Sequence, residues 1–251
     1  MLSFEERIKI KSNKEYSKTK GKMIMRKSLF FYLSVFRNLF VTFYQLMRGI
    51  WSINHLHGPI VSIFGGAHLR STSHYAAQAH ELAGLLIVND ISVITGGGPG
   101  IMEAANCGAF HAQNEQTKAR SIGITVKGLE EEPFNMCAQE KIIVDYFFVR
   151  KWLMVHYSIA FVFFPGGFGT LDELGEVITL MQTKKLVGMP IVLIGKHYWA
   201  HYFQWLHDYA LKDGLITQQD LDLIQITDNI DIALRLLKEH CEVCQETNEP
   251  L

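Results

Sequence analysis

The 251-residue sequence lacks an excess of charge of either sign, because 24 lysines and arginines stand against 25 aspartates and glutamates, for a formal net charge of −1. Nucleic-acid-binding domains usually carry a clear basic excess, so the composition argues against a nucleic-acid partner. An anionic ligand must then be held by local groups. Since 48% of the residues are hydrophobic, the chain can bury a large core, and its length suits one α/β domain with an extension.

Cysteine is scarce, with Cys107, Cys137, Cys241 and Cys244 as the whole set. Four cysteines are too few for a disulfide scaffold in a chain of this length. We interpret Cys107 as a small core residue and the last two as thiols at a fraying helix end, because a zinc site would need a second pair of ligands. This usage favours a reducing, cytoplasmic compartment and no metal site.

Several catalytic and cofactor motifs are missing. The glycine-rich stretch "TGGGPGIMEAAN" (95–106) is not followed by Gly-Lys-Ser/Thr, which excludes a Walker A loop. The dinucleotide fingerprint requires glycines at i, i+2 and i+5, but the third position counted from Gly96 is Ile101. No HExxH or GxSxG motif occurs. A nicotinamide-dependent enzyme is therefore disfavoured.

The N-terminal 57 residues differ from the rest of the chain. Residues 5–27 are rich in lysine and arginine, and residues 28–51 ("SLFFYLSVFRNLFVTFYQLMRGIW") are rich in aromatics. No small-residue cleavage site follows, which argues against a signal peptide, and Arg37 and Asn38 argue against a membrane span. We expect residues 1–57 to form a basic lead-in and a helical extension packed on the domain or on a partner subunit. An interfacial membrane helix over residues 28–51 is an alternative that is not favoured.

From residue 59 the pattern alternates between apolar runs and amphipathic segments, which predicts a Rossmann-like, doubly wound parallel sheet with helices on both faces. We expect this domain to cover residues 58–240 and a tail to cover 241–251. The expected strands are 59–66, 91–95, 120–126, the first part of 140–148, 159–164 and 189–195. The expected helices are 73–90, 101–113, 149–157, 171–185, 197–211 and 229–240.

Three expected strands end in glycines, at 65–66, 96–100 and 166–169. Ligands of such sheets lie beyond the carboxyl ends of the strands, and the amides at a helix start favour an anion. We therefore predict an anion site at this edge, with a ligand-free tight turn as the alternative. Pro99 has no N–H, so the expected donors in the second loop are the amides of Gly97, Gly98, Gly100 and Ile101.

The segment "PGGFGTLDE" (165–173) allows two interpretations. Thr170 and Glu173 have the spacing of a capping box, in which the glutamate folds back onto its own backbone. Alternatively the glycines and Thr170 bind a phosphate while Glu173 faces the ligand. The basic pair Arg150 and Lys151 is likewise either an exposed, snorkelling pair or a ligand for phosphate or a purine edge.

Taken together, "GGGPGIMEAAN" (96–106), the Arg-Lys pair at 150–151 and "PGGFGTLDE" (165–173) resemble the LOG (Lonely Guy) family. Its members are nucleoside 5′-monophosphate phosphoribohydrolases that have often been labelled lysine decarboxylases. The resemblance covers about residues 58–240. It implies a Rossmann-like homodimer without cofactor. It also implies hydrolysis of the N-glycosidic bond of AMP-like 5′-monophosphates, with cytokinin riboside monophosphates as candidates, to a free base and ribose 5-phosphate.

The resemblance also assigns roles to residues. It places the catalytic pair on Arg150 and Glu173. The predicted phosphate-binding residues are Gly97, Gly98, Gly100, Ile101, Met102, Gly166, Gly167, Gly169 and Thr170. Further candidates are Arg70, Ser71, Glu103 and Lys151. Arg70 or Ser71 would replace a serine that the family usually carries after the first strand, where this chain has Gly65–Gly66.

The chemistry is consistent with these residue types. Cleavage of an N-glycosidic bond passes through an oxocarbenium-like sugar, which a carboxylate stabilises, and a guanidinium stabilises charge on the departing base. The alternative function is a nucleotide-binding regulatory protein that does not hydrolyse its ligand. The presence of both Arg150 and Glu173 argues against it.

Overall fold

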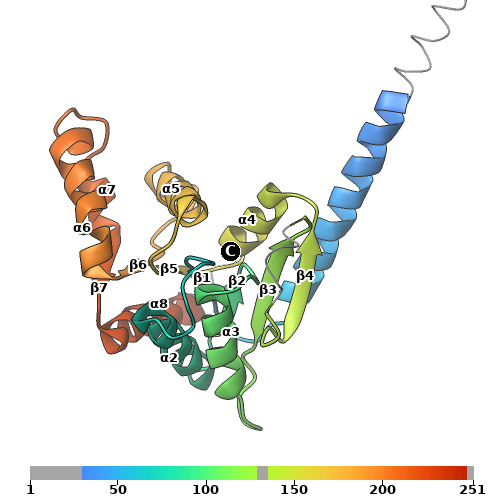
Figure 1. Ribbon diagram of the computed structural model, residues 1–251, viewed down its shortest axis with the longest axis horizontal. Helices are drawn as coiled ribbons and strands as arrows, with labels where there is room; N and C mark the ends of the chain where they lie inside the picture. The colour runs from blue at the N-terminus through green and yellow to red at the C-terminus, as the bar shows by residue number, and fades with distance from the viewer. Residues whose placement is uncertain (1–29, 129–134, 248–251) are drawn as a thin grey trace, which may run out of the picture. The chain divides into compact units, whose positions relative to one another are not determined.

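The computed structural model describes residues 30–128 and 135–247 (Figure 1). The chain divides into two compact units, Met1–Gln45 and Leu46–Leu251, so the division falls about twelve residues before the expected boundary at residue 57. A helix covers residues 30–53, as the aromatic-rich segment predicted. The basic lead-in lies outside the described residues.

The described part of the first unit exposes its aromatic side chains. Large exposed residues recur along it: Phe30, Phe31, Phe36, Phe40 and Phe43. Within the described ranges, no helix combines the length and the apolar character that crossing a bilayer requires.

The second unit is built on a parallel sheet of seven strands in the order β4-β3-β2-β1-β5-β6-β7, as predicted for a doubly wound fold. The register pairs Val61 of β1 with Val93 of β2 and with Ala160 of β5. The strands are β1 (Ile60–Phe64), β2 (Ser92–Thr95), β3 (Ser121–Val126), β4 (Glu140–Val144), β5 (Ala160–Phe163), β6 (Ile191–Ile194) and β7 (Ile224–Thr227).

Helices cover both faces of this sheet (Figure 1). One face packs against α2 (His74–Val88), α3 (Ile101–His111) and α8 (Ile230–Thr247). The other packs against α4 (Phe147–His156), α5 (Phe168–Gln182) and α6 (Lys196–Trp205). Because side chains alternate along a strand, β1 sends Val61 and Ile63 into the first core and Ile60 and Phe64 into the second. The two-sided burial explains why the strands read as continuous apolar runs.

Four details differ from the sequence-based expectation. Helix α5 begins at Phe168, three residues earlier than expected, with Gly167 as its N-cap. Helix α8 continues to Thr247, through most of the expected tail, because Cys241 repeats the buried spacing of Ala233 and Leu237. Residues 206–211 of the expected helix 197–211 form a π-helical segment. Two short elements, α7 (Gln218–Asp222) and β7, were not predicted.

The cysteines also differ from expectation. Cys107 on α3 forms a disulfide with Cys137, which precedes β4, so its interpretation as a small core residue is wrong. The two cysteines are 30 residues apart, and nothing in their local sequence indicates the pairing. Cys241 is buried on α8, whereas the side chain of Cys244 lies outside the described part.

Candidate active site

The site lies where the order of the strands reverses. From β1 the chain proceeds to β2 on one side, whereas from β5 it proceeds to β6 on the other, so the loops leaving these two neighbouring strands diverge. Such a divergence opens a crevice at the carboxyl ends of the strands. A cavity of about 430 Å³ lies there, lined by residues 65–68 after β1, by residues 167–170 after β5, and by side chains of α4 and α5.

The floor of the cavity is held by contacts between loops. The amide of Gly66 donates to the carbonyl of Pro165 at 2.9 Å, and the amide of Ile101 donates to the carbonyl of Gly66 at 3.2 Å. Gly100 has a φ of +69°, and a Cβ there would lie 2.4 Å from the Gly66 carbonyl oxygen. Only glycine fits this position, so the loops after β1, β2 and β5 meet at one point.

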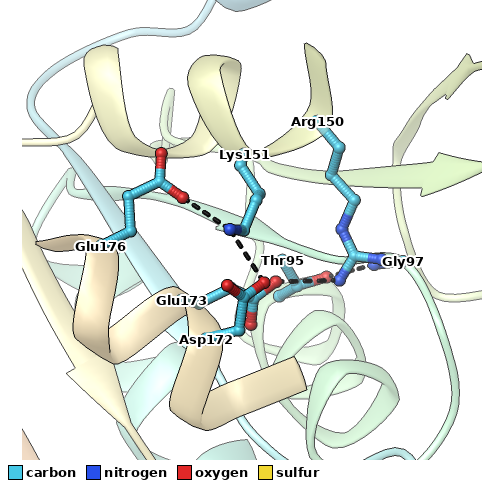
Figure 2. Close-up of polar contacts among 7 residues, drawn as sticks. All are labelled: Thr95, Gly97, Arg150, Lys151, Asp172, Glu173 and Glu176. Carbon is cyan, nitrogen blue, oxygen red and sulfur yellow. Dashed lines mark hydrogen bonds and ion pairs between the residues drawn. The ribbon is translucent and has the colours of Figure 1, made fainter. Parts of the chain in front are cut away.

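The two residues assigned to catalysis both line this cavity and point toward each other (Figure 2). Nη2 of Arg150, on α4, lies 3.4 Å from Oε1 of Glu173, on α5, and the two side chains are 10% and 12% exposed. Within the described residues, Nε of Arg150 is buried without a hydrogen-bond partner. The guanidinium thus pairs with Glu173 through Nη2 and leaves its buried Nε without a partner.

Glu173 does not fold back onto the backbone. The N-cap of α5 is Gly167, and no side-chain hydrogen bond caps this helix, so the capping-box interpretation of Thr170 and Glu173 is wrong. The amides of the N-cap and first turn have no acceptor within their own helix, and residues 167–170 line the cavity. The helix start thus offers N–H donors to the same space that Glu173 faces.

Burial raises the pKa of Glu173 to about 7, although the positive charges of Arg150 and Lys151 oppose the shift. The negative charges of Asp172 and Glu176 act in the same direction as burial. A carboxyl group with this pKa changes its charge near neutral pH, which suits a group that exchanges a proton during a reaction.

The loop after β2 is fixed by buried side chains. The hydroxyl of Thr95 donates to Oδ1 of Asn106 at 2.5 Å and accepts from the amide of Gly97 at 3.1 Å. Nδ2 of Asn135 donates to the carbonyl of Gly98 at 3.1 Å and to Oδ1 of Asn106 at 3.2 Å. The amides of Gly97 and Ile101, two of the four expected anion donors, are therefore already engaged within the protein.

The structure brings part of the predicted set to the cavity. The predicted residues that line it are Met102, Arg150, Lys151, Gly167, Gly169, Thr170 and Glu173. The predicted residues outside its lining are Arg70, Ser71, Gly97, Gly98, Gly100, Ile101, Glu103 and Gly166. Of the latter, Gly166 accepts a hydrogen bond from the hydroxyl of Tyr198.

Sequence reasoning missed other residues of the cavity wall. His68 lies just after the Gly65–Gly66 pair and lines the cavity. The position of this glycine pair directly after an apolar run could have indicated that the residues following it belong to the site. Phe147 and Phe168 also line the cavity and are 56% and 92% exposed. Phe147 reads as part of an apolar stretch, whereas Phe168 stands between two glycines of the "PGGFGTLDE" segment, whose glycines and polar residues drew the site prediction instead.

The chain is similar to curated nucleotide-cleaving enzymes. A pyrimidine/purine nucleotide 5′-monophosphate nucleosidase of Escherichia coli K12 is 28% identical over 173 residues, which are 67% of this chain and 38% of the relative. A cytokinin riboside 5′-monophosphate phosphoribohydrolase of Arabidopsis thaliana, LOG4, is 27% identical over 74% of this chain and 85% of the relative. The chain thus spans well under half the length of the bacterial relative.

Solved structures share the fold. The molybdenum cofactor binding protein of Rippkaea orientalis superposes with a TM-score of 0.53 at 21% identity, over 72% of this chain and 96% of that one. The molybdenum cofactor carrier protein of Chlamydomonas reinhardtii gives a TM-score of 0.52 at 21% identity, over 72% and 98% of the two chains. At this identity the likeness establishes the fold alone.

A family model described as "possible lysine decarboxylase" matches residues 102–237, more than half of the chain. The matched region includes Arg150, Glu173 and the whole "PGGFGTLDE" segment. The chain belongs to this family, the LOG family.

Proposed function

We propose that the protein hydrolyses the N-glycosidic bond of AMP-like nucleoside 5′-monophosphates, releasing the free base and ribose 5-phosphate. The observation that carries the proposal is the buried pair of Arg150 and Glu173 at the strand-order reversal, beside the start of α5 on the same cavity wall. The first amides of a helix have no acceptor within it. Backbone amides at a helix start can donate hydrogen bonds to a phosphate monoester. The carboxyl group can stabilise the positive charge that develops on the sugar carbon as the base leaves. The names of the curated relatives support the same reaction class.

In this proposal the phosphate is bound by the start of α5, with the amide and hydroxyl of Thr170 among its ligands. Binding energy from the phosphate holds C1′ of the ribose near Glu173. Glu173 in its ionised form orients a water molecule and accepts its proton. The water oxygen bonds to C1′, the C–N bond breaks, and the electron pair leaves with the base, which Arg150 stabilises until the base is protonated.

The decisive experiment incubates the full-length protein with AMP and measures free adenine. Wild type should release adenine, and Glu173→Gln should lose about 10³-fold in kcat/KM, because the general base is gone. Adenosine, which lacks the phosphate, should be a poor substrate. If Glu173→Gln kept full activity, the assignment of the base would be wrong.

The folding control follows from the raised pKa of Glu173. An unfolded chain ionises this group near 4.5, whereas the folded protein does so near 7. Glu173 therefore costs the native state stability as the pH rises through this window, and the cost is complete above pH 7. Glu173→Gln should be more stable than wild type at pH 8, by up to about 3 kcal/mol, and equal to it below pH 4.5. Lost activity with retained stability excludes unfolding as the cause.

The same group sets the pH dependence of the reaction. Since the ionised form of Glu173 is the active one, kcat/KM should rise with pH through about 7 and then level off. A profile that falls over this interval would mean that the protonated form is needed instead.

A non-hydrolytic nucleotide-binding protein is the second candidate, and it would bind AMP without releasing adenine. We also propose, from the resemblance, that the protein is a cytoplasmic homodimer that needs no cofactor and binds no nucleic acid.

A further inference from the structure

Lys151 forms two ion pairs between the helices that carry the catalytic pair. Its Nζ lies 2.8 Å from Oδ2 of Asp172 and 2.7 Å from Oε2 of Glu176. Figure 2 shows Lys151 reaching from α4 to the carboxylates of Asp172 and Glu176 on α5, beside the pair formed by Arg150 and Glu173. Its side chain is 18% exposed. It is thus not an exposed, snorkelling surface residue.

The ion pairs of Lys151 affect the charges that surround Glu173. Asp172 precedes Glu173 directly, and Glu176 follows it by three positions, so α5 carries three carboxyl groups within five residues. Like charges at this spacing oppose the ionisation of one another. The facing cations are Arg150 and Lys151 of α4, and His68 lines the same cavity from the loop after β1.

The two cations have different partners. Arg150 contacts Glu173 directly at 3.4 Å. Lys151 contacts its two neighbours instead, and although partial burial lowers the pKa of Lys151, the hydrogen bonds to Asp172 and Glu176 outweigh this and raise it. Lys151 therefore stays charged at the pH at which Glu173 titrates.

We propose that Lys151 is a positioning residue for Glu173: by bridging Asp172 and Glu176 it holds α5 against α4 and offsets part of the negative charge of these two carboxylates, which opposes the ionisation of Glu173. Its catalytic meaning rests on the proposed function. Its effect on Glu173 is a property of the unliganded protein, so it can be measured without substrate.

The test follows the ionisation of Glu173 by ¹³C NMR of the side-chain carboxyl group in the full-length, unliganded protein. Glu173→Gln assigns the signal. Lys151→Met should raise the titration midpoint by about one pH unit or more. Lys151→Arg keeps the positive charge, so its midpoint should stay close to that of wild type. Lys212→Met, at an exposed lysine elsewhere, should leave the midpoint unchanged. An unchanged or lower midpoint in Lys151→Met overturns the proposal.

A second variant keeps the test valid if Lys151→Met does not fold. The double variant Asp172→Asn, Glu176→Gln removes the carboxylates while leaving the lysine, so the Glu173 midpoint should fall below that of wild type. A midpoint that stays the same or rises contradicts the proposal.

The pH dependence of kcat/KM gives a second measurement, which would not change if Lys151 had a purely structural role. In Lys151→Met the acidic limb of kcat/KM for AMP should shift to higher pH, giving about a tenfold loss at pH 6.5 and little loss at pH 9. A uniform loss at every pH contradicts the proposal. Should wild type release no adenine at all, the proposed function fails, while the NMR titration still decides the role of Lys151.

Discussion

The two glycine loops of this protein look alike in the sequence and differ in the structure. The loop after β2, Gly96–Gly100, is braced. Thr95 and Asn135 hold its backbone, and Asn106 accepts a hydrogen bond from each of these two side chains. A Cβ at Gly96 would collide with Arg150. The loop after β5, Gly166–Gly169, has open positions at Gly167 and Gly169, where an added Cβ would meet nothing within 4 Å. We call them the braced loop and the open loop.

The difference indicates a division of labour. The braced loop lies against Arg150. Its Gly97 amide and the amide of Ile101, which follows the loop directly, both donate to protein acceptors, so the loop shapes the site. The open loop begins α5 on the cavity wall and leads to Glu173, so in the proposed function it is the part that contacts the phosphate. Glycine-rich sequence alone does not distinguish a structural turn from a ligand-binding one.

The largest effect is expected at the braced loop. In Gly96→Ala the new Cβ would lie 2.1 Å from Nη2 of Arg150 and 2.6 Å from Sδ of Met102. The guanidinium must move and its 3.4 Å contact with Glu173 is lost. We expect kcat/KM for AMP to fall by about 100-fold, the order that a lost electrostatic contact produces.

The matched control for this change is Gly175→Ala. Gly175 lies in α5 with open space around the position of its Cβ, so the substitution should leave activity unchanged and stabilise the helix by about 0.5–1 kcal/mol. If Gly96→Ala matched this control in activity, the braced loop would not position Arg150.

The fold was predictable because its signals are local. Apolar runs with glycines at their ends predict parallel strands, and the "PGGFGTLDE" segment places Glu173 on the following helix. The spacing alone does not distinguish a Glu173 that caps its own helix from one that faces a ligand. The structure excludes the cap, because Glu173 instead contacts Arg150, which lies 23 residues away in sequence and 3.4 Å away in space.

What could not be predicted depends on distant contacts. Asn135 fixes Gly98 from 37 residues away, and the disulfide of Cys107 joins positions 30 residues apart. Strand β7 has the sequence IQIT and is not buried throughout, so it lacks the continuous apolar run that marks β5 and β6, which are equally short. Such features follow from how the chain folds back on itself, which periodicity does not record.

The next effect concerns the side chain that braces the loop. Asn135→Ala removes the donor to the Gly98 carbonyl and to Asn106, and Asn135 is 2% exposed. Leaving buried acceptors unpaired costs about 1–3 kcal/mol, which urea unfolding measures. Since the loop shapes the site without taking part in the reaction, KM for AMP should rise by about tenfold with kcat nearly unchanged.

An exposed asparagine supplies the comparison for this variant. Asn114→Ala removes local turn contacts on the surface and should change KM little. A fall in kcat of Asn135→Ala that equals the rise in KM would place Asn135 in the reaction itself and remove the distinction between the two loops.

The smallest effect on stability is expected at the open loop. Gly167 has φ −93° and ψ −153°, which alanine adopts without strain, and its Cβ would meet no atom within 4 Å. Gly167→Ala should therefore change the free energy of unfolding by about 0.5 kcal/mol, the cost of a poorer N-cap. A methyl group on the cavity wall should nevertheless raise KM for AMP about fivefold by blocking close approach of the phosphate, with no effect on the weak turnover of adenosine. Equal KM values for AMP in the variant and wild type would mean that the phosphate lies elsewhere and that the open loop serves only to begin α5.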